Sequence, residues 1–180
     1  MKMISEKILF EGEWIVFKES IFKAKHGGLI KWESVSRRRP VTGLAIIAKM
    51  VPSNRYILIK QFRPAINNYV LGLPAGISDK GIEHALVELK EETGYTGKIT
   101  YVSPMLKSNT GIINEDSHTV LVEVDENDPA NQNPVQNLED AEDIEVVLVA
   151  KKDIKELFRT EMAKGTAIGS GLWYLFGLEI

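Results

Sequence analysis

The sequence predicts an α/β protein in which a mixed β-sheet lies between layers of helices. Three observations indicate this fold class: strand-like apolar runs come first, one amphipathic helix follows them, and further strands precede two helices at the carboxyl end. Helices packed on the faces of a sheet allow such an order of elements to bury a core. The 180 residues suffice for one domain with a sizeable core.

The first elements are expected to be strands. Short apolar stretches in residues 7–39, split by a His-Gly-Gly turn at 26–28, predict a hairpin-like N-terminal region. Two strands follow at 43–50 (GLAIIAKM) and 55–62 (RYILIKQF). The first of these two is apolar almost throughout, as expected for a strand covered on both faces.

The remaining elements alternate between helix and strand. Apolar residues at helical spacing predict a helix over 82–93, and Gly94 directly after it is a common helix stop. Strands are predicted at 119–124 and 144–150, with a polar surface loop between them. Two helices, near 151–162 and 166–177, are expected to close the chain.

Composition excludes several classes of function. There is no cysteine, so disulfides, thiolate metal sites and cysteine nucleophiles are excluded. No apolar run is long enough to span a membrane, and the N-terminus MKMISEKILFEGEW lacks an uninterrupted signal-peptide core. The net charge of −3 and scattered basic residues predict no nucleic-acid partner. These observations favour a cytoplasmic protein.

The predicted helix over 82–93 crowds negative charge on one face. Glu88, Glu91 and Glu92 stand at the i, i+3, i+4 spacing that places side chains together. Two like charges about 4 Å apart repel by about 4 kcal/mol near a protein surface. A hard divalent cation removes that cost, and Mg²⁺ binds carboxylates together with substrate phosphates. A solvated acidic helix face is the alternative interpretation.

The surrounding motif resembles a known family. The segment GISDKGIEHALVELKEETGY (76–95) is similar to the Nudix box, a loop–helix–loop motif of enzymes that hydrolyse nucleoside diphosphates linked to another group. The resemblance implies Mg²⁺ or Mn²⁺ as the cofactor. It also implies that Glu88 and Glu92 bind the metal, that Glu91 is a ligand or supports one, and that Ala75 offers its carbonyl.

The motif departs from the family pattern at two charged positions. The box has a Glu near the end of its loop and an Arg just before Glu88, whereas this sequence has Ile82 and Val87 there and is about three residues shorter between them. In the family the Arg helps to orient the glutamates. We expect an apolar contact to replace the ionic one.

The resemblance extends to one subfamily, the ADP-ribose pyrophosphatases. The stretches WESVSRR (32–38), IKQFRPAINNYVLGLPAG (59–76) and 103–118 are similar to it. This likeness implies a Nudix α/β/α sandwich with an N-terminal β region exchanged between two subunits of a homodimer. Residues 1–40 would be that region, used for dimerisation and base stacking, and residues 41–180 the hydrolase domain.

Four side chains are expected to hold the substrate, and Ala75 is expected to be a further substrate-binding residue. The resemblance implies that Trp14 and Trp32, one from each subunit, sandwich the adenine, although core or interface packing is the alternative for both. It implies that Arg37 and Arg63 grip the diphosphate and the terminal ribose. An arginine guanidinium suits phosphate oxygens because its planar fork donates two parallel hydrogen bonds.

The reaction also needs a base that takes a proton from the attacking water. The resemblance places this Glu in a loop before a late strand, and Glu142 in EDAEDIEVV stands at the matching position. Glu91 is the rival base, and a purely solvated acidic loop is the alternative for Glu142.

The sequence therefore predicts hydrolysis of the diphosphate of ADP-ribose or a related nucleoside diphosphate sugar. The products would be AMP, or another nucleoside monophosphate, and a sugar phosphate. Two alternatives stay open: a catalytically weak sensor that binds nucleotide sugars, and a Nudix hydrolase of another substrate such as a GDP-sugar or an oxidised nucleotide.

Overall fold

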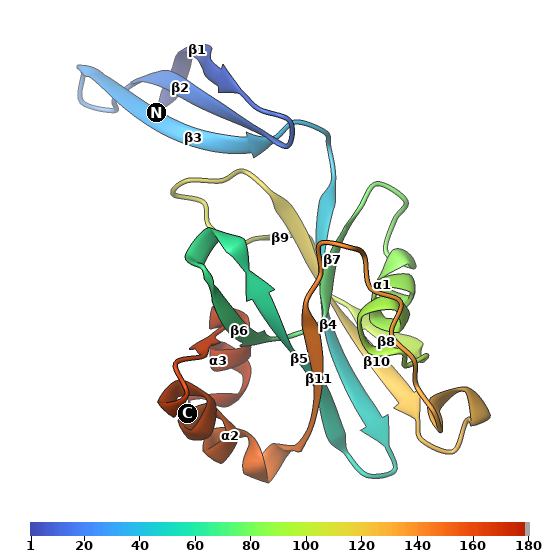
Figure 1. The fold of residues 1–180 in the computed structure, drawn as a ribbon. Helices are drawn as coiled ribbons and strands as arrows, with labels where there is room; N and C mark the ends of the chain where they lie inside the picture. The colour runs from blue at the N-terminus through green and yellow to red at the C-terminus, as the bar shows by residue number, and fades with distance from the viewer. Residues whose placement is uncertain (179–180) are drawn as a thin grey trace.

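The computed structural model describes residues 1–178, in which a three-stranded N-terminal sheet projects from a larger nine-stranded sheet (Figure 1). The larger sheet combines parallel and antiparallel pairs, and helices pack on both of its sides. The predicted α/β class, with a mixed sheet between helical layers, is confirmed. The division of the chain at residue 40 into two domains stays a prediction.

The small sheet consists of β1 (Lys2–Glu11), β2 (Ile15–Lys23) and β3 (Leu29–Arg37), all antiparallel in the order β1-β2-β3. The β2–β3 turn lies at the predicted place, where two glycines adopt positive φ angles. The expected hairpin is thus part of a three-stranded sheet. The sequence signal missed β1, because its apolar residues are exposed and do not follow the alternation of a half-buried strand.

The large sheet has the order β12-β6-β5-β4-β10-β8, with β11 on β5, β7 on β4 and β9 on β10. The pairs β4–β10 and β6–β12 are parallel, and the other pairs are antiparallel. Its strands are β4 (Thr42–Val51), β5 (Arg55–Arg63), β6 (Asn68–Gly72), β7 (Ala75–Ser78), β8 (Lys98–Val102), β9 (Leu106–Lys107), β10 (Asp116–Asp125), β11 (Ile144–Ala150) and β12 (Ala167–Ile168).

Two hydrophobic cores lie on opposite faces of this sheet. Helix α1 (His84–Thr93) inserts Leu89 into one core, and α2 (Ile154–Ala163) and α3 (Ser170–Phe176) contribute to the other (Figure 1). The neighbours Ile57 and Leu58 on β5 point into different cores, as alternation along a strand requires. Side chains of β5 at odd positions therefore face α1.

The strand predicted at 43–50 is present as β4, but only one of its faces is fully buried. Every second residue from Leu44 to Met50 lies in the core beneath α1, whereas Ala45 and Ile47 between them are half-buried. Helices α2 and α3 pack over β5, β6 and β11 and leave this part of β4 less covered. The expectation of full burial on both faces was wrong.

The last predicted helix, at 166–177, is shorter than expected. Its first residues form β12, a short parallel partner of β6, and α3 begins at Ser170. Gly169 ends the strand, and its N–H donates to the carbonyl of Leu71 at 2.8 Å. Glycine lowers helix propensity, and here the chain gains sheet hydrogen bonds instead.

The polar loop before β11 is tied to the end of α1. Gly94 stops the helix at φ +78°, and a Cβ there would lie 2.4 Å from the backbone nitrogen of Val135. The Asn137 N–H donates to the carbonyl of Glu91 at 2.8 Å. The Gln136 side chain donates to the carbonyls of Glu92 and Ile144 at 2.6 and 3.1 Å. The loop therefore packs along α1.

No helix within residues 1–178 is both long enough and apolar enough to cross a membrane. A cytoplasmic location stays a prediction from the sequence.

A buried carboxylate on α2 should make stability depend on pH. Glu161 accepts hydrogen bonds from Lys164 at 2.6 Å, Lys60 at 3.1 Å and Thr166 at 3.0 Å. The bond from Lys164, with those from Lys60 and Thr166, lowers the pKa of Glu161 to about 2. Because this pKa lies below the ordinary value of 4.5, the stabilisation is present above that value and is lost as pH falls towards 2.

We expect Glu161→Gln to lower the free energy of unfolding at pH 7 and to flatten its decrease between pH 5 and 2, measured by urea denaturation. Glu156→Gln is the matched control on the same helix, because Glu156 is exposed and pairs with Arg159 at the surface. Equal pH profiles for wild type and Glu161→Gln would contradict the role of this carboxylate.

Candidate active site

The two carboxylates Glu88 and Glu92 lie where α1 packs against β7. Leu89 is fully buried, and Glu92, three residues further along, shares its face and is only 2% exposed. One oxygen of Glu92, Oε2, accepts the Ala75 N–H at 2.9 Å. Burial of the hydrophobic stripe of α1 therefore also buries Glu92.

Glu88 lies one turn earlier and fills the space above Gly76. A Cβ built on Gly76 would lie 2.0 Å from the carboxyl carbon of Glu88, so a residue with a side chain would displace it. The Ile77 N–H forms a hydrogen bond with Glu88 that opposes the rise of its pKa. The Pro-Ala-Gly turn thus provides both an amide donor and the open space that these carboxylates need.

These carboxylates have strongly raised pKa values. Burial, with the nearby charges of Glu91, Glu142 and Glu139, raises the pKa of Glu88 to about 7. Burial, with the charges of Glu88 and Glu142, raises the pKa of Glu92 to about 8. The site concentrates negative charge without enough positive charge to balance it. Such perturbed groups are typical of functional sites.

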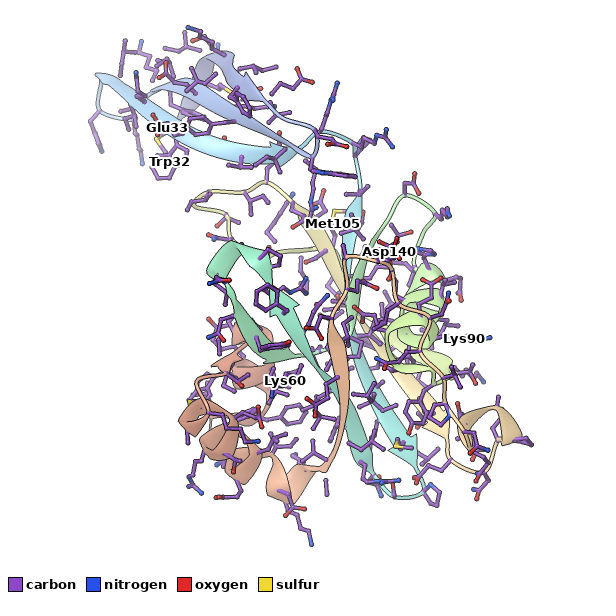
Figure 2. All side chains as sticks on the ribbon, viewed as in Figure 1. Trp32, Glu33, Lys60, Lys90, Met105 and Asp140 are labelled. Atoms are coloured by element: carbon purple, nitrogen blue, oxygen red, sulfur yellow. The ribbon has the colours of Figure 1, made fainter. Side chains whose placement is uncertain are left out.

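The residues predicted as base candidates lie at the edge of this cluster. Glu142 is half-buried, and its charge contributes to raising the pKa values of both Glu88 and Glu92. Its Oε2 accepts a hydrogen bond from the Glu139 N–H at 2.9 Å. Glu91 lies near Glu88 but borders a depression formed with Lys90 and Asn137. In Figure 2, Asp140 of the same loop lies beside the top of α1. The fold therefore brings both candidates to the carboxylates.

Arg63 also lies at the cluster. It ends β5 with an exposed side chain, on the odd-numbered face that points towards α1. Its positive charge lowers the pKa of Glu92 and partly offsets the effect of burial. The structure brings Arg63, Ala75, Glu88, Glu92 and Glu142 together from four separate segments of the chain.

The expected apolar replacement for the missing ionic contact is not found at Val87, whose side chain is 43% exposed. Instead, Nε2 of His84 lies 3.5 Å from Oε1 of Glu88, one helical turn before it. Ile82 packs against the core beneath α1. Local spacing contains the signal for the His84 contact, because residues i and i+4 meet on a helix.

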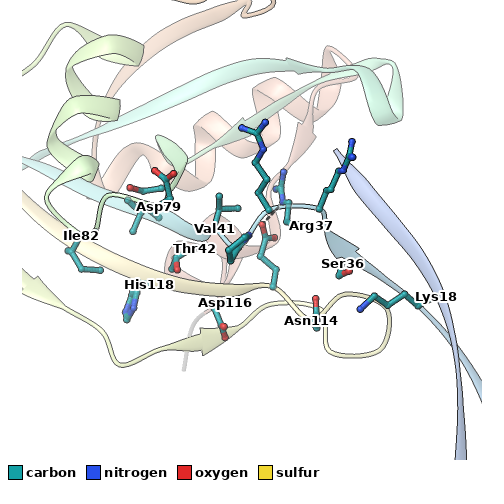
Figure 3. A pocket seen from close by; sticks show the side chains of 17 residues that line it. Lys18, Ser36, Arg37, Val41, Thr42, Asp79, Ile82, Asn114, Asp116 and His118 are labelled. Atoms are coloured by element: carbon teal, nitrogen blue, oxygen red, sulfur yellow. Dashed lines mark hydrogen bonds and ion pairs between the residues drawn. The ribbon is translucent and has the colours of Figure 1, made fainter. Parts of the chain in front are cut away.

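Arg37 lies in a separate cavity of about 850 Å³ below the N-terminal sheet (Figure 3). Its Nε donates to Oε1 of Glu115 at 2.8 Å. This cavity does not include Glu88 or Glu92, but it is bordered by Asp79 and Ile82 in the loop between β7 and α1. Arg37 and Glu88 therefore both lie beside the segment that leads from β7 to α1.

The two predicted stacking residues do not meet within one chain. Trp14 is 72% exposed and borders a cavity of about 580 Å³ together with Arg37. Trp32 faces the main sheet, and its Nε1 donates to the carbonyl of Gly111 at 3.1 Å (Figure 2). The register pairs Ile15 with Arg37, and Trp14 bonds to Arg38, so Trp32 lies six residues, or roughly 20 Å, further along β3.

Within residues 1–178, no three His, Asp or Glu side chains are already arranged as a closed ion site. The carboxylates of α1 therefore lie near one another, but their oxygens do not all point to one position where an ion would bind.

Gln136 joins the end of α1 to β11. The sequence did not predict this contact, because no local pattern marks a contact made across 44 residues.

No protein-family model matches the sequence, but individual proteins do. A Schizosaccharomyces pombe protein described as an uncharacterized Nudix hydrolase is 32% identical over 168 residues, covering 88% of this chain and 82% of that protein. The mouse ADP-sugar pyrophosphatase is 32% identical over 160 residues, covering 83% of this chain and 73% of that protein. The ADP-ribose pyrophosphatase of Saccharomyces cerevisiae is 39% identical over 144 residues, covering 74% of this chain and 62% of that protein.

Among solved structures, the fold is similar to that of an ADP compounds hydrolase. The two share a TM-score of 0.64 at 18% sequence identity, over 86% of this chain and 82% of that chain. This likeness concerns the fold alone.

The contact between Gly76 and Glu88 leads to a test. We expect Gly76→Ala to push the Glu88 carboxylate into solvent, because the new Cβ would overlap it and the side chain can rotate away. Without burial, the pKa of Glu88 should fall from about 7 towards its ordinary value of 4.5. NMR titration of carbon-13-labelled glutamate side chains measures this shift.

Gly72→Ala is the matched control, because a Cβ on Gly72 meets no atom within 4 Å. It should leave both raised pKa values unchanged. If Gly76→Ala also leaves the pKa of Glu88 near 7, the packing of Glu88 on Gly76 is not what keeps it buried.

Proposed function

This chain belongs to the Nudix hydrolases, and we propose that it hydrolyses the diphosphate of ADP-ribose or a related nucleoside diphosphate sugar. The observation that carries the proposal is the pair of carboxylates on α1 formed by buried Glu92 and half-buried Glu88, with Glu91 beside them. Relatives named ADP-sugar pyrophosphatase and ADP-ribose pyrophosphatase support this substrate class. With ADP-ribose, the products would be AMP and ribose 5-phosphate.

We propose Mg²⁺ or Mn²⁺ as the cofactor, held by Glu88, Glu91, Glu92 and the carbonyl of Ala75. The donors fit a hard divalent cation, because they are carboxylate and carbonyl oxygens gathered where burial and mutual repulsion raise their pKa values. When bound, such an ion neutralises diphosphate charge and makes a water easier to deprotonate.

Glu142 is the proposed base, with Glu91 as the rival. Its carboxylate lies close enough to Glu88 and Glu92 to raise the pKa of both. In the reaction, Glu142 accepts a proton from the water while that oxygen bonds to phosphorus and the bridging P–O bond breaks. The bridging oxygen leaves with the other product. The turn that holds Glu142 next to the carboxylates supports this role.

We propose that Arg37 and Arg63 bind the substrate. Arg63 points towards the carboxylates, where the diphosphate would lie. Arg37 pairs with Glu115 and would exchange this carboxylate partner for a substrate oxygen. Arg37 lies beside Ile77 and Asp79, and Arg63 lies near Glu92, so an extended substrate could contact both.

We propose that the protein is a homodimer in which the small N-terminal sheet packs on a second copy. Every residue of β1 is exposed, and five of its large apolar residues are among them: Met3, Ile4, Ile8, Leu9 and Phe10. An exposed apolar area of this extent is typical of an interface. Because Trp14 and Trp32 lie roughly 20 Å apart along β3 in one chain, a second copy could bring one of each to the same base.

Sedimentation equilibrium tests the dimer. We expect twice the chain mass of 20.2 kDa for the wild type, and a shift to the monomer for Phe10→Asp. Tyr174→Asp is the control, because Tyr174 is 70% exposed on α3, away from the small sheet. A wild-type monomer at high concentration would contradict the proposal.

The proposed activity is tested with ADP-ribose and Mg²⁺, with EDTA as a control, by quantifying AMP chromatographically. We expect metal-dependent AMP. Glu92→Gln should lower turnover on the order of a hundredfold, because it removes the charge but keeps the shape of a metal-binding side chain. A folded Glu92→Gln variant with unchanged turnover would contradict the role assigned to Glu92.

The other outcomes identify the alternatives. ADP-ribose that binds in calorimetry without AMP release would indicate the sensor, which the exposed Val87 in place of an arginine would favour. Turnover of a GDP-sugar or an oxidised nucleotide but not of ADP-ribose would keep the reaction and replace the substrate.

A further inference from the structure

The turn that carries Glu142 is closed on itself. The Glu142 N–H donates to the carbonyl of Glu139 at 3.0 Å, and the Glu139 N–H donates to Oε2 of Glu142 at 2.9 Å. These bonds define the shape of the turn, but they do not fix its place above α1. That place depends on how the turn joins the rest of the protein at its two ends.

At the N-terminal end, the chain is held by α1. The Asn137 N–H bonds to Glu91, and Gln136 links Glu92 to the start of β11. These contacts are made two or more residues before the turn begins. They hold residues 136 and 137 against α1, and Gln136 also reaches Ile144 beyond the turn, but neither residue contacts residues 139–143 in these bonds.

At the C-terminal end, Asp143 makes two contacts with the sheet. Its carbonyl accepts the Phe62 N–H of β5 at 3.0 Å, and its carboxylate oxygen Oδ2 accepts a hydrogen bond from the Tyr69 hydroxyl of β6. Asp143 is the residue directly after Glu142. The backbone bond extends the β5–β11 ladder, which begins at Ile144, by one residue. The bond from Tyr69 adds a side-chain contact directly after Glu142.

Tyr69 is itself held firmly. It pairs with Phe62 across the β5–β6 ladder, and their rings pack edge to face with centroids 5.4 Å apart. The Lys60 ammonium lies 5.6 Å from the centre of the Tyr69 ring. The hydrogen bond to Asp143 raises the pKa of the Tyr69 hydroxyl, so the hydroxyl keeps its proton and remains a donor at neutral pH.

We propose that Tyr69 is a positioning residue for Glu142: its hydrogen bond to Asp143 holds the 139–143 turn so that the Glu142 carboxylate reaches the site formed by Glu88 and Glu92. This inference rests on the proposed function, in which Glu142 is the base. Tyr69 touches the turn and acts through it. A hydrogen bond to a charged partner is a strong enough contact to matter for such placement.

Tyr69→Phe removes the hydroxyl and keeps the ring packed on Phe62. We expect kcat for ADP-ribose to fall on the order of tenfold with KM nearly unchanged, because a misplaced base slows the chemical step. Asp143→Ala should give the same loss, and the double variant no further loss, since both remove one bond. Tyr101→Phe is the matched control, because Tyr101 is 56% exposed on β8 and should leave kcat unchanged.

The deciding measurement uses the Glu142→Gln background. There, Tyr69→Phe should have no further effect on kcat, because the base that it positions is already absent. A further loss in that background, or a raised KM, would show that Tyr69 contacts the substrate and would overturn the proposal. An unchanged kcat for Tyr69→Phe in the wild-type background would also overturn it.

Amide hydrogen exchange provides a readout that does not depend on activity. We expect peptides covering 139–143 to exchange faster in Tyr69→Phe, with no change in Tyr101→Phe. If the wild type hydrolyses no nucleotide sugar, the proposed function fails. Unchanged exchange in Tyr69→Phe would instead refute the anchoring itself, so the two failures are distinguishable.

Discussion

The crowding of buried Glu92 and half-buried Glu88 against the Pro-Ala-Gly turn is the constraint on which the rest of the site depends. Helix α1 must bury Leu89 to complete the core, and the helical repeat then buries Glu92 on the same face. Glu88 can lie beside it only because Gly76 has no side chain. Stability alone would not favour this crowding, since burial penalises each charge and each charge repels the other. A site that concentrates uncompensated negative charge is suited to recruiting cations.

The other parts of the site are attached to this centre from distant segments. Strand β5 brings Arg63 to the carboxylates, β7 supplies the amide of Ala75, and the loop before β11 brings Glu142. The same loop is bonded to the end of α1 and to the β5–β6 edge. The base candidate is thus held between the two elements that carry its partners, which is how a flexible turn can keep a defined geometry.

The N-terminal sheet has a different physical character. Within residues 1–178 no helix packs on it, and its outer strand exposes large apolar residues near both ends. A three-stranded sheet with so little buried surface gains little free energy from its own packing. A second copy would supply the missing contacts, and it would also bring together stacking residues that one chain holds apart.

The sequence by itself determined the local features of this protein. It predicted α1, its end at Gly94 and the strands β4, β5, β10 and β11, because their patterns repeat over short distances. It also identified Glu88, Glu91 and Glu92, since helical spacing places them together. Only the tertiary structure decided which of them is buried and which other side chains reach them. Tyr69 bonds to Asp143 across 74 positions and Gln136 bonds to Glu92 across 44, and no local pattern encodes such distances. The same limit explains β12, where sheet hydrogen bonds replaced the first residues of the predicted helix.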